Sequence, residues 1–244
     1  MQVGKLRNGV VFCNVGQGDM AIIMDGYWQM VIDTGKNDGK GRECWDRNVV
    51  WWDRKIEVIL ITHDDTDHSG GINQLTAGLT VDKLITDGSY KIGSVNPGEW
   101  VVLSTGDKVK HRAIELEVLD NPKNRQSKKD TGLIAKVTNK NTNYWFMADA
   151  DTETEQRLAW TRPQLRSFGG QMILKVSHHG SPNGTSETLL EAINPTEAVV
   201  SVGKNNYGHP SGQVIERLET YGVKVRRTDI EGDIKYASII NNRY

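Results

Sequence analysis

Short apolar runs alternate with polar, glycine-rich segments along almost the whole chain. Most of these runs are rich in Val, Ile and Leu and have the length of a β-strand, so they predict strands. The predicted strands cover residues 10–15, 20–24, 28–32, 56–61, 81–86, 100–103, 114–119, 132–137, 144–147, 172–176, 198–202, 223–227 and 234–240. Other segments carry apolar residues at helical spacing, such as Trp45, Val49 and Trp52 at i, i+4 and i+7. The predicted helices cover residues 43–55, 71–77, 152–159, 186–193 and 213–221.

The order of these elements indicates the fold class. The chain begins as a β-meander and continues with strands and helices mixed throughout. Such a mixture is typical of an α/β or α+β protein in which helices cover sheets. No low-complexity linker divides the 244 residues, so we expect a single domain over 1–244.

Composition narrows the class further. With 37% hydrophobic residues, 25% charged residues and a net charge of −1, the chain has the values of an ordinary soluble protein. This charge argues against a globally basic nucleic-acid binder and leaves a local basic groove open. No apolar run approaches about 18–20 residues, and the N-terminus lacks a signal peptide, so we expect a cytoplasmic protein without a membrane span. Cys13 is therefore expected to be a reduced core residue, with no disulfide to Cys44.

The candidate chemistry gathers at strand ends. Five of the six histidines lie at or just after apolar runs, together with acidic residues. They are His63, His68, His178, His179 and His209. Strand ends that meet at one edge of a sandwich are a usual place for a site built by loops. The densest cluster covers residues 61–71, where a buried cation would compensate the charge of the carboxylates.

These residue types are metal ligands. Neutral imidazole nitrogens and ionised carboxylates bind divalent ions, and the cluster offers enough of them for two. Asp149, at another strand end, is the natural bridge because a carboxylate has two oxygens. The competing interpretation is that each His caps a strand end without a metal. Five such residues together favour the metal site.

Several motifs resemble those of a known superfamily. His63-x-Asp65-x-Asp67-His68 resembles the HxHxDH metal signature of the metallo-β-lactamase fold. The wider set resembles the ComEC-type competence branch of that superfamily: VGQGD at 15–19, IDTG at 32–35, THDDTDHSGG at 62–71, HHGS at 178–181 and SVGKNNYGHP at 201–210. In that branch the domain usually follows a membrane channel for DNA uptake and is regarded as a nuclease. The resemblance implies an αββα sandwich with two similar halves, at about 1–120 and 121–244, here as a stand-alone soluble chain.

The resemblance also assigns ligands. It implies a first metal held by His63, Asp65 and Asp149, and a second held by Asp67, His68, Asp149 and His179, with His178 as a neighbouring group or phosphate contact. Three departures stand out: Asp65 replaces a His, Asn14 stands where the branch usually has Asp, and a further His expected near 130–133 is absent. Asp130 is a weak substitute. The oxygen-rich first site favours Mn²⁺ or Mg²⁺, with Zn²⁺ as the alternative.

The predicted activity is metal-dependent phosphodiester hydrolysis. A metal-bridging hydroxide would attack the phosphorus of DNA, with RNA as a further candidate substrate. Asp67 would orient the nucleophile, while His209 and Lys204 would stabilise the phosphate or the leaving oxygen. One alternative is a β-lactamase or another hydrolase of small molecules such as lactones, esters or cyclic nucleotides. The other alternative is a non-catalytic module that binds DNA or metal.

Two further segments leave their role open. Trp51 lies off the helical stripe, so it either packs against the sheet or stacks on a base. Residues 121–130 hold Lys123, Arg125, Lys128 and Lys129. They form either a solvated loop or contacts to a phosphate backbone.

Overall fold

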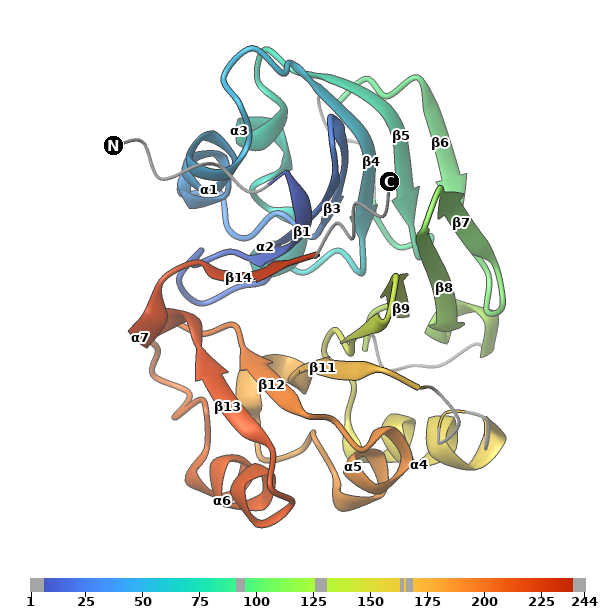
Figure 1. Cartoon of the computed structure of the whole chain (residues 1–244), viewed down its shortest axis with the longest axis vertical. Coiled ribbons are helices and arrows are strands. Elements are labelled where there is room, and N and C mark those ends of the chain that lie inside the picture. Colours follow the sequence, from blue (N-terminus) through green and yellow to red (C-terminus); the bar gives the residue numbers. More distant parts are fainter. Residues whose placement is uncertain (1–6, 91–94, 126–130, 163–164, 166–168, 239–244) are drawn as a thin grey trace, which may run out of the picture.

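Two β-sheets form the centre of the protein (Figure 1). The computed structural model describes residues 7–90, 95–125, 131–162, 165 and 169–238. The first sheet has the order β14-β1-β2-β3-β4-β5-β6 and the second β13-β12-β11-β10-β9-β8-β7. In the first, the strands are β1 Asn8–Phe12, β2 Ala21–Asp25, β3 Trp28–Ile32, β4 Lys55–Ile61, β5 Thr80–Thr86, β6 Glu99–Val102 and β14 Ile234–Ala237. In the second, they are β7 Lys108–His111, β8 Ile114–Asp120, β9 Ile134–Asn139, β10 Thr142–Phe146, β11 Gln171–Lys175, β12 Glu197–Val200 and β13 Lys224–Arg227.

Helices cover the outer face of each sheet (Figure 1). α1 Lys40–Asn48 and α3 Ile72–Thr76 pack on the first sheet, and α4 Thr152–Thr161, α5 Glu187–Ile193 and α6 Gly212–Thr220 on the second. The described residues also include short turns of helix: α2 Thr66–Ser69, α7 Thr228–Glu231, and the 3₁₀ helices η1 Pro122–Arg125 and η3 Ser177–Gly180. The predicted αββα sandwich is confirmed.

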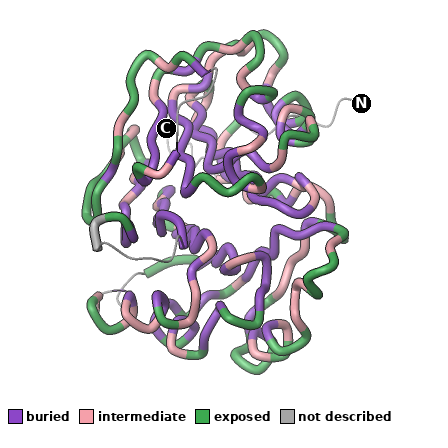
Figure 2. The backbone as a smooth tube through the Cα atoms, turned by 180° about the vertical axis from the view of Figure 1, so that it is seen from behind, coloured by how far each residue is buried: buried purple, intermediate pink, exposed green. Residues whose placement is uncertain are grey.

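The alternation of side chains explains the four layers. Ile23 on β2 lies between the sheets, whereas its neighbour Ile22 packs under the helices. In the second sheet, Tyr144 and Phe146 face the inner core and Trp145 faces the helices. Strands buried on both faces read as continuous apolar runs because side chains alternate with a period of two. Accordingly, the buried parts of the backbone lie inside and the exposed parts on the outer helices and turns (Figure 2).

Strand direction brings the site segments together. β3 to β6 run parallel to one another in the first sheet, and β10 to β13 do so in the second. The carboxyl ends of parallel strands lie at the same edge, where functional loops gather. The sheets divide the chain between β6 and β7, so β7 and β8 already lie in the second sheet, and β14 returns to the first.

The cysteines are paired, so the expectation of a reduced Cys13 was wrong. Cys13 and Cys44 form a disulfide between the end of β1 and helix α1, with Cα atoms 5.9 Å apart. Both residues are fully buried. Apolar surroundings suit a reduced cysteine equally well, so the sequence pattern did not distinguish the two states. Disulfides are rare in reducing compartments, and this bond weighs against the cytoplasmic expectation.

Helix α1 is shorter than its apolar stripe predicted. It ends at Asn48, and the chain turns before β4. Trp45 and Val49 are buried as predicted, but Trp52 is 53% exposed, so its assignment to the stripe was wrong. Trp51 is also exposed. It precedes β4 whereas His63 follows it, and a seven-residue strand of about 3.3 Å per residue separates the two by roughly 20 Å.

Among the described residues, no helix has both the length and the apolar composition that crossing a lipid bilayer requires.

Candidate metal centre

Asp33 organises the first group of site residues from the end of β3. Its Oδ1 accepts a hydrogen bond from the backbone N–H of Thr62 at 2.8 Å, and its Oδ2 lies 2.9 Å from His68 Nδ1. The Thr62 hydroxyl also donates to Asp33, at 2.9 Å. Asp33 therefore holds together the ends of β3 and β4 and helix α2. The sequence interpretation included the motif around Asp33 but gave this residue no role.

Hydrogen bonds select the free nitrogen of three imidazoles. Since Asp33 accepts from His68 Nδ1, the Nε2 of neutral His68 carries a free lone pair. Likewise, His179 Nδ1 donates to the carbonyl of Ser201 at 2.9 Å. The Thr62 hydroxyl gives its one hydrogen to Asp33, so His63 Nδ1 donates to Thr62 at 3.0 Å. Each neutral ring thus presents Nε2 as an available ligand atom.

These free atoms lie buried beside Asp149. The Nε2 atoms of His63, His68 and His179 and the Oδ1 atom of Asp149 are buried without a hydrogen-bond partner among the described residues. Buried polar atoms normally have hydrogen-bond partners, so a group of four that have none indicates that they bind a ligand. Three imidazole nitrogens and a carboxylate form a donor set suited to a divalent metal ion. The residues present therefore fit the metal that the motif implied.

The two oxygens of Asp149 face different partners. Oδ1 lies 3.2 Å from His68 Nε2, whereas Oδ2 lies 3.4 Å from His178 Nε2 and 3.9 Å from His63 Nε2. We call the residues around Oδ2 the first site and those around Oδ1 the second site. One ligand atom from each of His63, Asp65 and Asp149 lies within 4.8 Å of the others. The same holds for Asp19, His68, Asp149 and His179.

The three aspartates of the central motif take different positions. Asp65 Oδ2 lies 3.5 Å from His63 Nε2, beside the first site. Asp67 Oδ2 lies 3.4 Å from His179 Nε2, beside the second. Asp64 is exposed on the surface, where it accepts a long hydrogen bond from the hydroxyl of Ser69.

Close backbone packing fixes this motif in place. The Asp19 N–H donates to the carbonyl of Asp67 at 3.0 Å. A Cβ at Gly18 would meet that same carbonyl oxygen at 2.6 Å, so only glycine fits there. Gly71 likewise lies against the carbonyl of Thr34. The glycines of both motifs thus allow the strand-end loops to touch one another.

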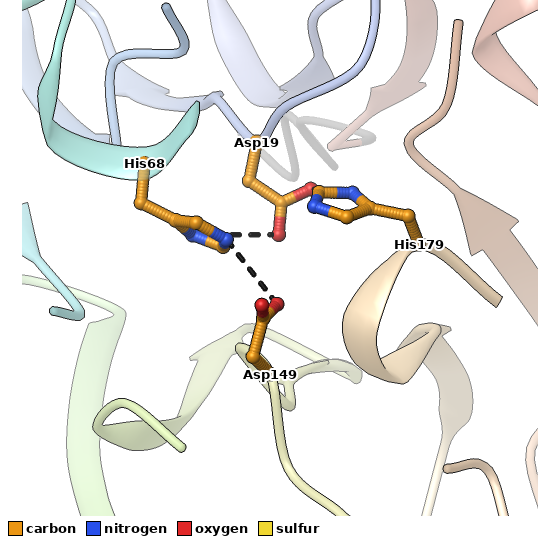
Figure 3. Close-up of side chains that lie close together, drawn as sticks. All are labelled: Asp19, His68, Asp149 and His179. Atoms are coloured by element: carbon orange, nitrogen blue, oxygen red, sulfur yellow. Dashed lines mark ion pairs between the residues drawn. The ribbon is translucent and has the colours of Figure 1, made fainter. Parts of the chain in front are cut away.

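A buried ion pair lies behind the second site, and sequence analysis missed it. Lys175, on β11, and Asp19 are both buried and form an ion pair. The Asp19 carboxylate also lies 3.8 Å from His68 Nδ1 and 3.4 Å from His179 Nδ1 (Figure 3). Asp19 therefore faces the Nδ1 side of both rings. The Nε2 atom of His68 faces Asp149, and the Nε2 atom of His179 faces Asp67. Lys175 is the one ionisable residue in the apolar run 172–176, and this isolated charge was the signal in the sequence that could have indicated a buried ion pair.

Charged neighbours within the candidate site shift several pKa values. Burial lowers the pKa of His179, but the Asp19 and Asp67 carboxylates overcome it and raise that pKa to about 9. Burial also opposes the charge of His68, yet Asp149 and Asp33 raise its pKa well above the usual value. Burial would raise the pKa of Asp149, but His68 and His179 hold it well below its usual value. The acidic residues and protonated imidazoles stabilise one another until a metal displaces the protons.

Backbone atoms occupy the region where a further histidine was expected. The Asp149 N–H donates to the carbonyl of Thr131 at 3.1 Å. Gly132 packs so closely on the His63 ring that a Cβ there would lie 2.7 Å from Nδ1. Thr131 is buried, and its hydroxyl has no hydrogen-bond partner among the described residues. Asp130, Lys128 and Lys129 and the side chain of Arg125 lie outside the described residues; Lys123 is exposed.

The late histidines come from loops after β11 and β12. His178 and His179 lie in η3, both with positive φ, and the buried Glu155 carboxylate accepts bonds from Ser177 and Thr185 around this turn. The His209 ring lies 5.7 Å from the ring of His178. His209 therefore lies next to His178 in the structure. Lys204, on the same loop, is exposed and forms no ion pair with a described residue.

The chain has the metallo-β-lactamase fold. The metallo-β-lactamase fold protein YhfI from Bacillus subtilis matches it with a TM-score of 0.61 at 9% sequence identity, over 94% of this chain and 100% of YhfI. A diphosphatase from the PhnP family matches with a TM-score of 0.54 at 13% identity, over 95% of this chain and 98% of the diphosphatase. Likeness at these identities establishes the fold and leaves the substrate open.

In sequence, the chain resembles the ComEC-type competence proteins. Recombination protein 2 of Haemophilus influenzae is 27% identical over 96% of this chain. ComE operon protein 3 of Bacillus subtilis and competence protein ComA of Neisseria gonorrhoeae are 27% and 28% identical, each over 75% of this chain. The chain spans only between 25% and 29% of the length of these three relatives. No model of a known protein family matches the chain.

Proposed function

We propose that the protein is a metal-dependent phosphodiesterase that cleaves nucleic acid, with DNA as the favoured substrate and RNA as the second. One observation carries the proposal: the two oxygens of Asp149 each face imidazole Nε2 atoms. This arrangement suits two neighbouring divalent ions that share one carboxylate. The similarity to competence proteins supports nucleic acid as the substrate class.

The first metal would be held by His63, Asp65 and Asp149, and the second by Asp67, His68, Asp149 and His179. His178 faces the same Asp149 oxygen as His63 and is a further candidate ligand or phosphate contact at the first site. We assign Asp19 to its ion pair with Lys175, because its oxygens face Nδ1 atoms that already have partners. The carboxylate share of the first site favours Mn²⁺ or Mg²⁺ over Zn²⁺.

Two bound ions would supply ionisation of water near neutral pH and neutralisation of phosphate charge. The chain's own residues would position the substrate. Burial and the nearby His178 lower the pKa of His209, so its neutral ring offers one N–H donor to a phosphate or leaving oxygen near pH 7. Asp67 would orient the attacking group beside His179. Lys204 and Lys123, both exposed, would attract the phosphate backbone.

A substrate panel tests this function. Metal-stripped protein is incubated with labelled single-stranded DNA, duplex DNA and RNA, with Mn²⁺, Mg²⁺ or Zn²⁺ added separately. A β-lactam and a lactone serve as rival substrates, because the same fold hosts other hydrolases. We expect DNA cleavage with Mn²⁺ or Mg²⁺, falling about tenfold between 50 and 200 mM salt if two phosphates are contacted.

Two results would reject the proposal. Hydrolysis of the β-lactam or lactone without cleavage of any nucleic acid would favour a small-molecule hydrolase. Binding of metal or DNA with no hydrolysis of any substrate would favour a non-catalytic module.

A further inference from the structure

One loop beside the metal centre is held rigid by a single side chain. Asn205 donates from Nδ2 to the carbonyls of Gly203 and His209, at 2.9 and 2.8 Å. Its Oδ1 accepts from the backbone N–H groups of Tyr207 and His209, at 3.0 and 3.1 Å. These four bonds tie both ends of the 203–209 loop to its centre. The position of the Tyr207 backbone is therefore fixed relative to His209.

At the tip of this ordered loop, Tyr207 exposes 73% of its surface. Its ring centroid lies 5.7 Å from that of His209, with the planes tilted by 33°. The His209 ring lies 5.7 Å from that of His178, whose Nε2 is 3.4 Å from Asp149. The rings of His178, His209 and Tyr207 thus form a continuous row from the Asp149 carboxylate to the surface.

An exposed ring on a rigid loop beside the site is suited to stacking. An exposed aromatic ring presents a flat apolar face that another flat ring can cover, and such stacked pairs are favourable. Nucleobases are such rings, and proteins that bind single strands use aromatic side chains as stacking platforms. A base within a duplex already stacks on its neighbours and is unavailable to the ring.

We propose that Tyr207 is a positioning residue that stacks on an unpaired base next to the phosphate held at the metal centre. This inference rests on the proposed nuclease function and sharpens it, because it selects single-stranded nucleic acid over duplex. The hydroxyl is not required, since stacking uses only the ring face. The energy is gained in substrate binding, so the Michaelis constant depends on Tyr207 more than the turnover number does.

The test compares variants on substrates with and without bases. Cleavage is measured for the wild type, Tyr207→Ala and Tyr207→Phe. Each is given a labelled single-stranded oligonucleotide and, separately, a deoxyribose-phosphate oligomer that lacks bases. Tyr27→Ala is the matched control, because Tyr27 is also exposed but lies in the β2–β3 turn, at the opposite end of β3 from Asp33. We expect Tyr207→Ala to raise KM for the oligonucleotide about tenfold, with kcat within about twofold.

The expected controls are equally specific. Tyr207→Phe and Tyr27→Ala should match the wild type, and Tyr207→Ala should leave cleavage of the base-free oligomer unchanged. An unchanged KM for the oligonucleotide, or an equal loss on the base-free oligomer, would overturn the role of Tyr207 while leaving the nuclease function intact.

A binding measurement separates the two proposals. Should the wild type cleave no nucleic acid, the proposed function fails. Fluorescence anisotropy of the same oligonucleotides on metal-free protein then tests Tyr207 alone. Binding of the single strand that weakens about tenfold in Tyr207→Ala but not in Tyr27→Ala supports stacking. No binding, or equal binding by both variants, rejects it.

Discussion

At the scale of single residues, Asp33 determines which nitrogen of His68 is free. It accepts the Nδ1 hydrogen at 2.9 Å and also holds the Thr62 N–H and hydroxyl. Carboxylate partners of this kind orient a ligating imidazole and raise its basicity. The candidate metal centre would therefore depend on a residue that touches no metal.

Substitution of Asp33→Asn should weaken metal binding. Asparagine has one oxygen only, so either His68 or Thr62 would meet an NH₂ group in place of an acceptor. Titration calorimetry with Mn²⁺ should give an affinity about 10–100 times weaker than that of the wild type. Asp64→Asn is the control, because Asp64 is exposed and its loss should leave the affinity unchanged. Equal affinities for both variants would contradict the role of Asp33.

The raised pKa of His179 predicts how pH affects the metal-free protein. The pKa of this imidazole is about 9 in the folded protein, against 6.5 for an unperturbed histidine. Protonation thus stabilises the fold fully below pH 6.5, and this stabilisation, about 3 kcal/mol, is lost as the pH rises through 9. Urea unfolding of chelator-treated protein should show the free energy of unfolding falling from pH 6 to 9.5.

Metal should reverse this trend, because a metal ion competes with protons for the same nitrogen. The stabilisation by added Mn²⁺ should grow with pH over the same range. The variant His179→Gln should lose part of the metal-free slope, because His68, whose pKa is also raised, contributes the rest. A flat profile in the wild type, or an unchanged slope in the variant, would show that His179 carries no bound proton.

At the scale of elements, the disulfide connects the strand before the Asp19 loop to helix α1. Cys13 and Cys44 are separated by 31 positions in sequence, so the bond closes a moderate loop. Restricting the unfolded chain in this way is worth roughly 3–4 kcal/mol. A reductant should lower the free energy of unfolding by about that amount, measured by urea titration with and without dithiothreitol.

The double variant Cys13→Ser with Cys44→Ser is the control, since a reductant should not change its stability. Alkylation followed by mass spectrometry gives an independent reading of the cysteines. Two alkylated thiols in unfolded, unreduced protein would contradict the disulfide.

Strands that are apolar along most of their length were predictable from sequence. The apolar runs at 144–147 and 56–61 indicated strands, and β10 and β4 are observed there. The end of α1 was not predictable, because Trp52 continues the helical spacing by coincidence while the backbone has already turned. Large aromatic side chains fit either a buried stripe or an exposed turn, so spacing alone did not decide.

At the scale of the whole molecule, contacts between distant segments were the part that sequence could not supply. The motifs placed His63, His68, Asp149 and His179 at strand ends, and the fold brings them to one edge. The pairing of Lys175 with Asp19 joins β11 of the second sheet to the loop between β1 and β2 of the first. Nothing in the local pattern of either residue identifies its partner, because the packing of the two sheets creates the contact.

The inner core draws side chains from both sheets. We therefore propose that residues 1–244 form one domain, and that the metal centre assembles only when the sheets pack. Residues from the first sheet's loops, such as His68, then meet Asp149 from the second. Asp149 is the central residue of the proposed metal centre, since both candidate sites share it.

The most direct test follows cleavage of a labelled oligonucleotide as Mn²⁺ is added to metal-stripped protein in known equivalents. We predict no cleavage without metal, activity that rises to a plateau at about two ions per chain, and loss of at least about a hundredfold in Asp149→Ala. Asp64→Asn should follow the wild-type curve. Cleavage by metal-free protein, or wild-type activity in Asp149→Ala, would contradict the shared two-metal centre.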